Sequence, residues 1–301
     1  MDSNVHMQPM DPKSAQVSQQ GQPYVYNSSI PPQYASQVQG FQQPQPYQVG
    51  VQAPAATVAT LPAGGQIWMV RPAAMPGVPP GLEYLAGLDQ LLMHQQVELF
   101  EAVTGIETKN RYAVKNTLGQ QCYFAYEESG LCMRLWCKNN RGFDMHIVDN
   151  LGQEVIHAYR DFKCCVGCCW CIKGDCCAFT LNVNSPTGVP IGRIVQECSS
   201  WKPKYAVENA AGETILVIRG PCCIWSGPCC PCEVDMNILT ANESQQIGHI
   251  SRQYAGFAKE CCTNATNFGI TFPRDLDIKA KALLVAATFL VDMMYFERQN
   301  Q

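Results

Sequence analysis

The chain has 301 residues and 18 cysteines; 47% of its residues are apolar, 15% are charged, and its formal net charge is −4. A chain of this length buries an adequate core without crosslinks, and its first residues lack the basic and apolar regions of a secretory signal, so we expect reduced thiols and no disulfide framework. The acidic balance argues against binding nucleic acid by bulk electrostatics. The sequence contains no nucleophile elbow, phosphate-binding loop or HExxH motif, and it therefore predicts no enzyme.

The N-terminal part of the chain, residues 1–65, is rich in Gln and Pro and carries only three charged side chains. Its few apolar residues show no period, which predicts a disordered arm ahead of a folded domain at residues 66–301. Within the arm, Pro31, Pro32 and Tyr34 form the PPxY pattern that WW domains bind as a polyproline II turn. We predict a WW ligand here, with a plain spacer as the alternative.

The start of the domain has the spacing of a helix. After Pro80 and Gly81, leucines recur at roughly helical intervals through LEYLAGLDQLLMHQQ, residues 82–96. This pattern predicts a short amphipathic helix, with Pro and Gly marking its beginning. The next residues, VELFEAVTG at 97–105, are predicted to open the first strand.

Three hairpins follow, each with a glycine in its turn. They cover residues 112–126, 145–159 and 205–218, and their turns contain Gly119, Gly152 and Gly212. Asn or Asp followed by Gly between apolar runs indicates a hairpin, because these residues tolerate the positive φ angles of tight turns. Larger blocks also repeat, each with a cysteine-rich loop between strands. The sequence thus predicts one antiparallel all-β body, large enough to close as a barrel.

Twelve of the cysteines gather in the two loops of these repeated blocks. A run of free thiols this dense is reactive, so we expect crosslinking, metal binding or lipidation. Zn²⁺ is one alternative, because Cys165 and Cys168 have the spacing of zinc ligands. The tandem doublets supply more thiolates than a tetrahedral ion uses. The clusters are Cys164, Cys165, Cys168, Cys169, Cys171, Cys176 and Cys177, then Cys222, Cys223, Cys229, Cys230 and Cys232.

The chain closes with a segment that is apolar on every side, for which we predict a helix at residues 279–297. Such a helix is either a membrane span or the buried core of a larger body. The apolar run is short for a span, and it contains Asp292, whose carboxylate is costly at a bilayer centre. We favour a helix enclosed by the β body, with Asp292 turned to an end or a polar partner. The alternative is a single span with Lys279 and Lys281 on the cytosolic side.

Several of these stretches resemble the phospholipid scramblases. They are PPGLEYL, LDQLLMHQQVELFE, the cysteine-rich loop, NFGITFPRDLD and AKALLVAATFLVDMMYFE, in this order over residues 66–298. The resemblance implies a tubby-like fold, a closed antiparallel β-barrel around a central hydrophobic C-terminal helix. It also implies calcium-stimulated, ATP-independent movement of phospholipids between membrane leaflets, in both directions.

The resemblance further implies attachment to the cytosolic face of the plasma membrane by palmitate on the first cysteine loop. Two or more acyl chains are needed for stable anchoring, which suits a cluster. Phe162 and Trp170 would add interfacial contacts and Lys163 would meet anionic headgroups. A homo-oligomer and a type II single-pass anchor are open alternatives. Another is an adaptor without lipid translocation, whose arm recruits WW or SH3 domains. The palmitoylation candidates are Cys164, Cys165, Cys168, Cys169, Cys171, Cys176 and Cys177.

The family's proposed calcium loop falls on Asn264 to Asp275. Charged ligands are missing from it, and calcium affinity depends on the number of anionic oxygens, so we predict weak Ca²⁺ binding. The alternative is a half-buried strand leading to a helix whose N-terminus Asp275 and Asp277 favour. The basic import signal of some relatives is also reduced here to Arg252, so we expect neither nuclear entry nor nucleic-acid binding. The calcium candidates are Asn264, Thr266, Phe268, Ile270, Phe272 and Asp275.

Overall fold

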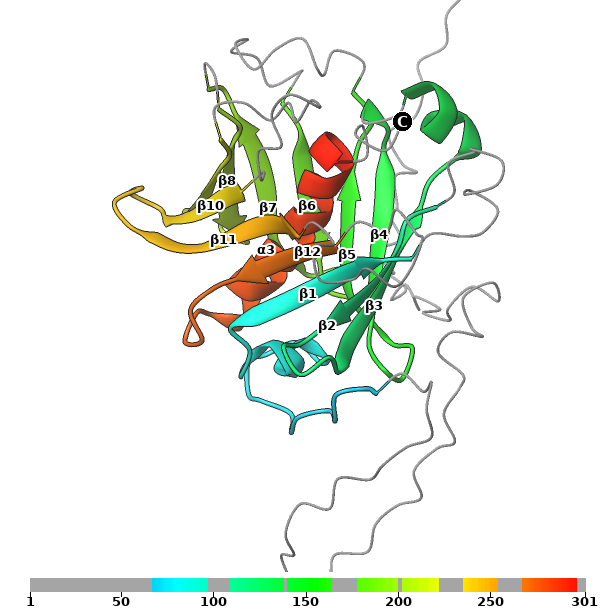
Figure 1. The fold of residues 1–301 in the computed structure, drawn as a ribbon, viewed down its shortest axis with the longest axis vertical. Helices are drawn as coiled ribbons and strands as arrows, with labels where there is room; N and C mark the ends of the chain where they lie inside the picture. The colour runs from blue at the N-terminus through cyan, green and yellow to red at the C-terminus, as the bar shows by residue number, and fades with distance from the viewer. Residues whose placement is uncertain are drawn as a thin grey trace, which may run out of the picture.

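The fold, seen in a computed structural model, is a closed antiparallel barrel around one helix (Figure 1). The structure describes residues 67–96, 109–137, 140–163, 178–199, 202–221, 235–253 and 267–296. Each described strand pairs with its neighbours in sequence, and β1 pairs with β12 to close the ring. The predicted fold class is confirmed. The strands are β1 (Gln90–Gln95), β2 (Arg111–Lys115), β3 (Gln121–Glu128), β4 (Phe143–Val148), β5 (Glu154–Arg160), β6 (Thr180–Asn184), β7 (Pro190–Glu197), β8 (Lys204–Asn209), β9 (Thr214–Arg219), β10 (Asp235–Thr240), β11 (Gln246–Gln253) and β12 (Asn267–Thr271).

The three predicted hairpins are confirmed as β2–β3, β4–β5 and β8–β9. Each turn begins with Asn116, Asp149 or Asn209, whose side-chain oxygen accepts two backbone N–H groups at 2.9–3.0 Å. Three residues later comes a glycine with φ of 76°, 72° or 82°, which an L side chain rarely adopts. Local side-chain chemistry thus sets the turns and, through them, the register of the paired strands.

The predicted C-terminal helix is confirmed as α3 (Ile278–Val291), which continues as the π-helical turn η4 (Asp292–Phe296). Every residue from Ala280 to Val291 is buried, which confirms the enclosed helix. Gly192 of β7 allows the close approach of the strand, since a Cβ there would lie 2.9 Å from Leu283 Cδ1. Among the described residues, no helix has both the length and the hydropathy needed to cross a membrane.

The predicted helix at residues 82–96 is wrong. A short 3₁₀ turn, η1 (Leu82–Leu85), is followed by strand β1, whose Leu91 and Met93 are fully buried. The residues of β1 pair with β12 on one side and β2 on the other, so their backbone groups are satisfied within the sheet. Closure of the barrel therefore overrides the local helical spacing. The first strand begins at Gln90, before the stretch 97–105 in which it was predicted; that stretch lies outside the described residues.

Lys281 joins η1 to the helix inside the barrel. Its Nζ donates to the carbonyl oxygens of Leu85 at 3.1 Å, Leu88 at 2.7 Å and Arg274 at 2.7 Å. It also lies 5.2 Å from the centre of the Phe272 ring. A buried ammonium group is stable only when its donors are paired, and here the loop carbonyls supply the partners.

The two ends of the barrel differ. We call the end that carries the tight turns and η1 the hairpin end. The opposite end, which carries η4 and the π-helical turn η2 (Met133–Cys137), is the loop end. In Figure 1 the red end of the helix lies at the loop end, toward the top. Both cysteine clusters fall in connections between strands that meet the barrel at the loop end, after Arg160 of β5 and after Arg219 of β9.

Candidate functional site

The loop end of the barrel is the candidate functional site, because the chain enters and leaves the first cysteine cluster there. Strand β5 ends at Arg160, and β6 begins at Thr180. The cysteines at positions 164–177 and 222–232 lie outside the described residues. So do Pro31, Pro32 and Tyr34 of the predicted WW ligand. What the structure does describe is the barrel rim on which these connections are rooted.

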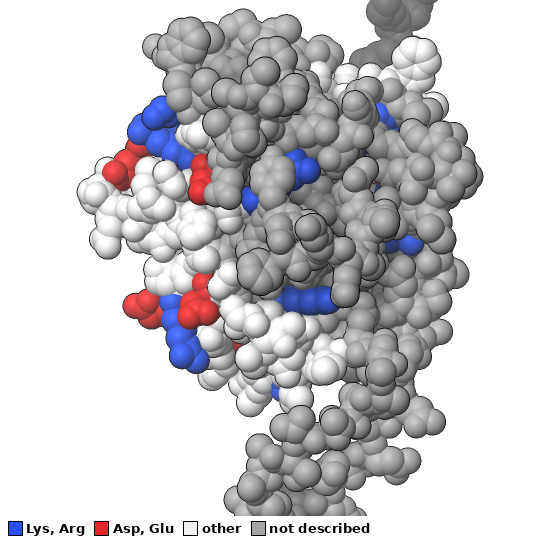
Figure 2. Space-filling view, viewed as in Figure 1, with Lys and Arg blue, Asp and Glu red and all other residues white. Residues whose placement is uncertain are grey.

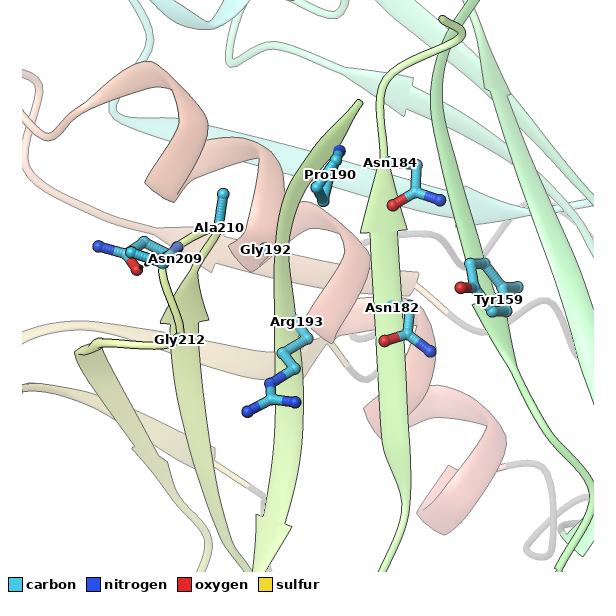
Figure 3. Close-up of a pocket in the computed structure, with 10 residues that line it drawn as sticks. Tyr159, Asn182, Asn184, Pro190, Gly192, Arg193, Asn209, Ala210 and Gly212 are labelled. Atoms are coloured by element: carbon cyan, nitrogen blue, oxygen red, sulfur yellow. Dashed lines mark hydrogen bonds between the residues drawn. The ribbon is translucent and has the colours of Figure 1, made fainter. Parts of the chain in front are cut away.

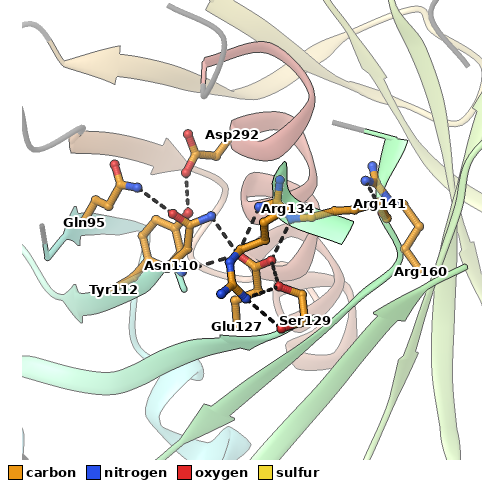
Figure 4. A network of polar contacts seen from close by, with 9 residues as sticks. All are labelled: Gln95, Asn110, Tyr112, Glu127, Ser129, Arg134, Arg141, Arg160 and Asp292. Atoms are coloured by element: carbon orange, nitrogen blue, oxygen red, sulfur yellow. Dashed lines mark hydrogen bonds and ion pairs between the residues drawn. The ribbon is translucent and has the colours of Figure 1, made fainter. Parts of the chain in front are cut away.

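A buried polar network lies inside the barrel at this end (Figure 4). At its centre, Glu127 of β3 accepts from Arg141 Nε at 2.8 Å and Nη2 at 3.0 Å, a bidentate pair in which both side chains are 0% exposed. The same carboxylate accepts from Asn110 Nδ2 at 2.8 Å and from Ser129 Oγ at 2.6 Å. Arg160 extends the network by donating to the Arg141 carbonyl oxygen at 2.7 Å. The Glu127 carboxylate thereby joins the β1–β2 connection to both ends of the β3–β4 connection.

The charge of Glu127 is held by these partners. Burial alone would raise its pKa, but the Arg141 guanidinium and the hydrogen bonds from Ser129 and Asn110 outweigh burial and hold the pKa below the ordinary glutamate value. The carboxylate is therefore ionised at neutral pH, and it can accept from all its donors at once. The sequence analysis singled out neither Glu127 nor its three partners, because their positions along the chain form no motif with a characteristic spacing.

Asp292, the one acidic residue in the apolar segment, finds a polar partner as predicted. It lies at the start of η4, and its carboxylate accepts a hydrogen bond from the Tyr112 hydroxyl of β2 (Figure 4). Further along η4, Tyr295 bonds the hydroxyl of Tyr205 in β8. The end of the helix is thus fastened to two sides of the barrel by buried hydrogen bonds.

The described part of the predicted calcium loop is a strand followed by a helix cap. Phe268 and Ile270 of β12 are buried in the barrel interior, and β12 pairs with both β11 and β1. Phe272 follows the strand and is also buried, whereas Asp275 is exposed. Asp277 caps α3, accepting from the backbone of Lys279 at 2.9 Å. Asn264 and Thr266 lie outside the described residues, and these positions do not test calcium binding.

A groove of about 380 Å³ runs along the outer wall of the barrel, over β5 to β8 (Figure 3). Tyr159, Asn182 and Arg193 lie opposite one another on three neighbouring strands. Arg193 Nε bonds Glu208 at 2.5 Å, and the Asn209 side chain is hydrogen-bonded within its own turn. This lining offers hydrogen-bond donors and acceptors to a small polar group. The full lining is Tyr159, Asn182, Asn184, Pro190, Gly192, Arg193, Asn209, Ala210, Ala211 and Gly212.

Two histidines that the sequence motifs did not single out stack on the outer wall of the barrel. His146 of β4 and His157 of β5 lie opposite each other, with ring centres 4.8 Å apart. The hydrogen bond that His157 Nε2 donates to the Asp144 carboxylate favours the protonated ring and raises the pKa of His157. The register of the predicted 145–159 hairpin would have revealed the pair. Within the described ranges, no group of three or more His, Cys, Asp or Glu side chains is arranged to hold a metal ion.

The charge on the visible surface is mixed. Figure 2 shows small groups in which basic and acidic side chains lie next to one another. Ion pairs of the same kind join β7, β8, β9 and the β10–β11 turn. Lys204 contacts Glu197 and Glu243 at 2.8 Å, and Arg219 contacts Glu243 at 2.7 Å. In these ion pairs, the charge of the basic side chains is balanced by neighbouring carboxylates.

Comparison with known proteins identifies the family. The Scramblase family profile matches residues 69–298. Phospholipid scramblase 1 is 44% identical over 235 residues in both mouse and human, which covers 78% of this chain and 69% or 71% of the relative. Human phospholipid scramblase family member 5 is 42% identical over 250 residues, covering 79% of this chain and 89% of its own. No solved structure matches the chain.

The chain belongs to the Scramblase family. The matched residues cover the described barrel with its buried helix, and they also include both cysteine clusters. The family resemblance inferred from the sequence motifs is thereby confirmed.

Proposed function

We propose that this chain is a phospholipid scramblase, which moves phospholipids between the two leaflets of a membrane in both directions without ATP. The observation that carries the proposal is the family match over residues 69–298, together with relatives named phospholipid scramblase at 42–44% identity. Association with membranes follows from the same membership. Because α3 fills the barrel interior, we place the lipid path outside the barrel, where the attached protein thins or disorders the bilayer.

Attachment, in this proposal, is by palmitate on the cysteine cluster at 164–177, on the cytosolic face of the plasma membrane. The rooting of this connection at the loop end supports it, since acyl chains there would hold one end of the barrel against the bilayer. By contrast, burial raises the pKa of the Cys122 thiol in β3 to about 12, so that thiol stays protonated and enclosed. A single acyl chain binds reversibly and several anchor stably, which gives the cluster its role.

Reconstitution into symmetric liposomes that contain a fluorescent phospholipid tests lipid movement. With a scramblase, dithionite should bleach label beyond the outer leaflet; an adaptor would leave the inner-leaflet label protected, and this result would contradict the proposal.

Replacing the seven cysteines at 164–177 by serine should remove hydroxylamine-sensitive acyl groups and release the protein from cell membranes. Cys198→Ser, an exposed thiol outside the clusters, is the matched control and should stay bound. Stoichiometric zinc without acyl groups would overturn the lipid anchor.

Calcium stimulation is part of the proposal, with a weak site. Asp275 is an exposed carboxylate between β12 and α3, and it is the single carboxylate among the calcium candidates. We expect Asp275→Ala to shift the calcium response of the liposome assay to higher concentration. An unchanged response would remove this residue from the site.

The N-terminal arm is proposed to bind WW or SH3 domains, and Tyr34→Ala should abolish binding to a WW domain.

A further inference from the structure

The connection between β3 and β4 carries large apolar side chains on the surface of the loop end. It includes η2, where Trp136 is 85% exposed, and Leu131, just before η2, is 53% exposed. Phe162, which follows β5 at the same end, is 46% exposed. Single exposed apolar residues are common, but an almost fully exposed tryptophan at the end that carries the cysteine clusters calls for a partner. We call Leu131, Trp136 and Phe162 the apolar rim.

The buried network holds η2 in place from both sides. Arg134 points inward, and its Nη1 donates to the Ser129 carbonyl at 2.7 Å and to the Ser129 hydroxyl at 3.1 Å. Ser129 and Arg141, which bracket the connection, both bond the Glu127 carboxylate (Figure 4). Residues two apart on a helical turn do not share a face, so fixing Arg134 inward directs Trp136 outward.

The same connection touches the root of the cysteine cluster. The backbone N–H of Lys163 donates to the Asn140 carbonyl at 3.3 Å. A Cβ on Gly142 would lie only 3.0 Å from the Phe162 nitrogen, so the two backbones pack directly. The first residues of the cysteine-bearing connection therefore leave the barrel against the segment that presents Trp136.

We propose that the apolar rim inserts into the headgroup region of a phospholipid bilayer, with Trp136 as its main contact. This inference rests on the proposed function and adds a second membrane contact to the acyl chains. An indole ring suits the interface, because it has an apolar body and one polar N–H. A contact that is weak alone becomes effective when a tether keeps it at high local concentration. The bilayer is the occupant favoured by the direct backbone contact with the root of the anchoring cluster.

Partitioning of the full-length chain into vesicles tests the rim. The protein is treated with hydroxylamine to remove acyl groups and mixed with vesicles of phosphatidylcholine and phosphatidylserine. We expect Trp136→Ala to lower the partition coefficient about tenfold, because burying a large aromatic side chain is worth at least that factor. Trp136→Phe should retain part of the binding. Leu151→Ala is the matched control: Leu151 is 59% exposed at the hairpin end, and its loss should change nothing.

A second measurement locates the side chain in the acylated, reconstituted protein. Lipids brominated on their acyl chains should quench a component of the tryptophan emission that is missing in Trp136→Phe. Three results would overturn the rim contact. The wild type and Trp136→Ala could partition equally, neither could bind the vesicles, or the quenching could be unchanged in Trp136→Phe. Failure of the liposome assay with a tenfold partition difference intact would instead contradict lipid movement alone. The two proposals therefore fail separately.

Discussion

At the scale of single residues, Glu127 does the most to join distant parts of this chain. Its carboxylate accepts hydrogen bonds from Asn110 in the β1–β2 connection and from Ser129 and Arg141 at the two ends of the β3–β4 connection. A buried ion pair adds little net stability compared with apolar packing, but removal of one partner leaves the other charge buried without compensation. Glu127 is therefore a residue whose loss should be felt across the loop end.

We predict that Glu127→Gln lowers the free energy of unfolding by about 3 kcal/mol, because Arg141 is left buried without a counterion. Urea unfolding at pH 7 measures the change. Glu128→Gln is the matched control, since Glu128 is the next residue of β3 and its side chain is 63% exposed. Its effect should stay within about 0.5 kcal/mol, as for most surface substitutions. Equal stability of the two variants would contradict the role given to Glu127.

The pH dependence has a definite sign. The folded-state pKa of Glu127 lies below its unfolded value, so its contribution is complete above the unfolded pKa, about 4.3 for glutamate, and is lost as pH falls through the folded pKa. Below about pH 4.3, the wild type should therefore lose stability more steeply than Glu127→Gln. Unfolding curves collected from pH 6 downward would show the two stabilities converging; parallel loss would count against this assignment.

At the scale of secondary-structure elements, the helix and the η1 turn stabilise each other through Lys281. The ammonium group supplies three donors to carbonyls in the connections around the hairpin end. Gly192 makes a similar point for packing, because β7 runs close enough to α3 that even a methyl group would contact Leu283. Contacts of this kind bring together residues almost 200 positions apart. They show how a helix without a polar face is held in one orientation.

We predict that Lys281→Met lowers the free energy of unfolding by about 3 kcal/mol, because three carbonyl oxygens lose a charged donor while the apolar stem is kept. Lys279→Met is the control on the same helix, since Lys279 is exposed at its first turn. Thermal unfolding of both variants measures the difference. A Lys281→Met protein that melts with the Lys279→Met protein would rule out the role of these hydrogen bonds.

At the scale of the whole molecule, the barrel needs its helix as a core, whereas the arm is predicted to be independent of it. The strands direct their buried side chains onto α3, and every helical residue from Ala280 to Val291 is enclosed. Removing it would leave a cavity much larger than any a packed protein tolerates. The function proposed here uses the closed barrel as a rigid support, with its loop end held against the membrane.

We predict that deletion of residues 278–301 abolishes cooperative thermal unfolding, because the barrel loses its core. Deletion of residues 1–65, the predicted arm, should leave the melting temperature unchanged within about 2 °C, less than the shift from 1 kcal/mol. Circular dichroism during heating measures both. A cooperative transition in the first variant, or a large shift in the second, would contradict the domain organisation predicted from the sequence.

The sequence by itself determined the features whose signals lie within a few residues. Asn or Asp with Gly set the three hairpins, and an apolar surface all around predicted the enclosed helix and the polar partner of Asp292. Only the tertiary structure decided that residues 90–95 form a strand. Their backbone groups pair with β12 and β2 and so close the ring, in place of the internal hydrogen bonds that a local helix would make. It alone brought Asn110, Glu127 and Arg141 together and turned Trp136 outward. These arrangements depend on contacts between distant segments, which no local pattern of residues encodes.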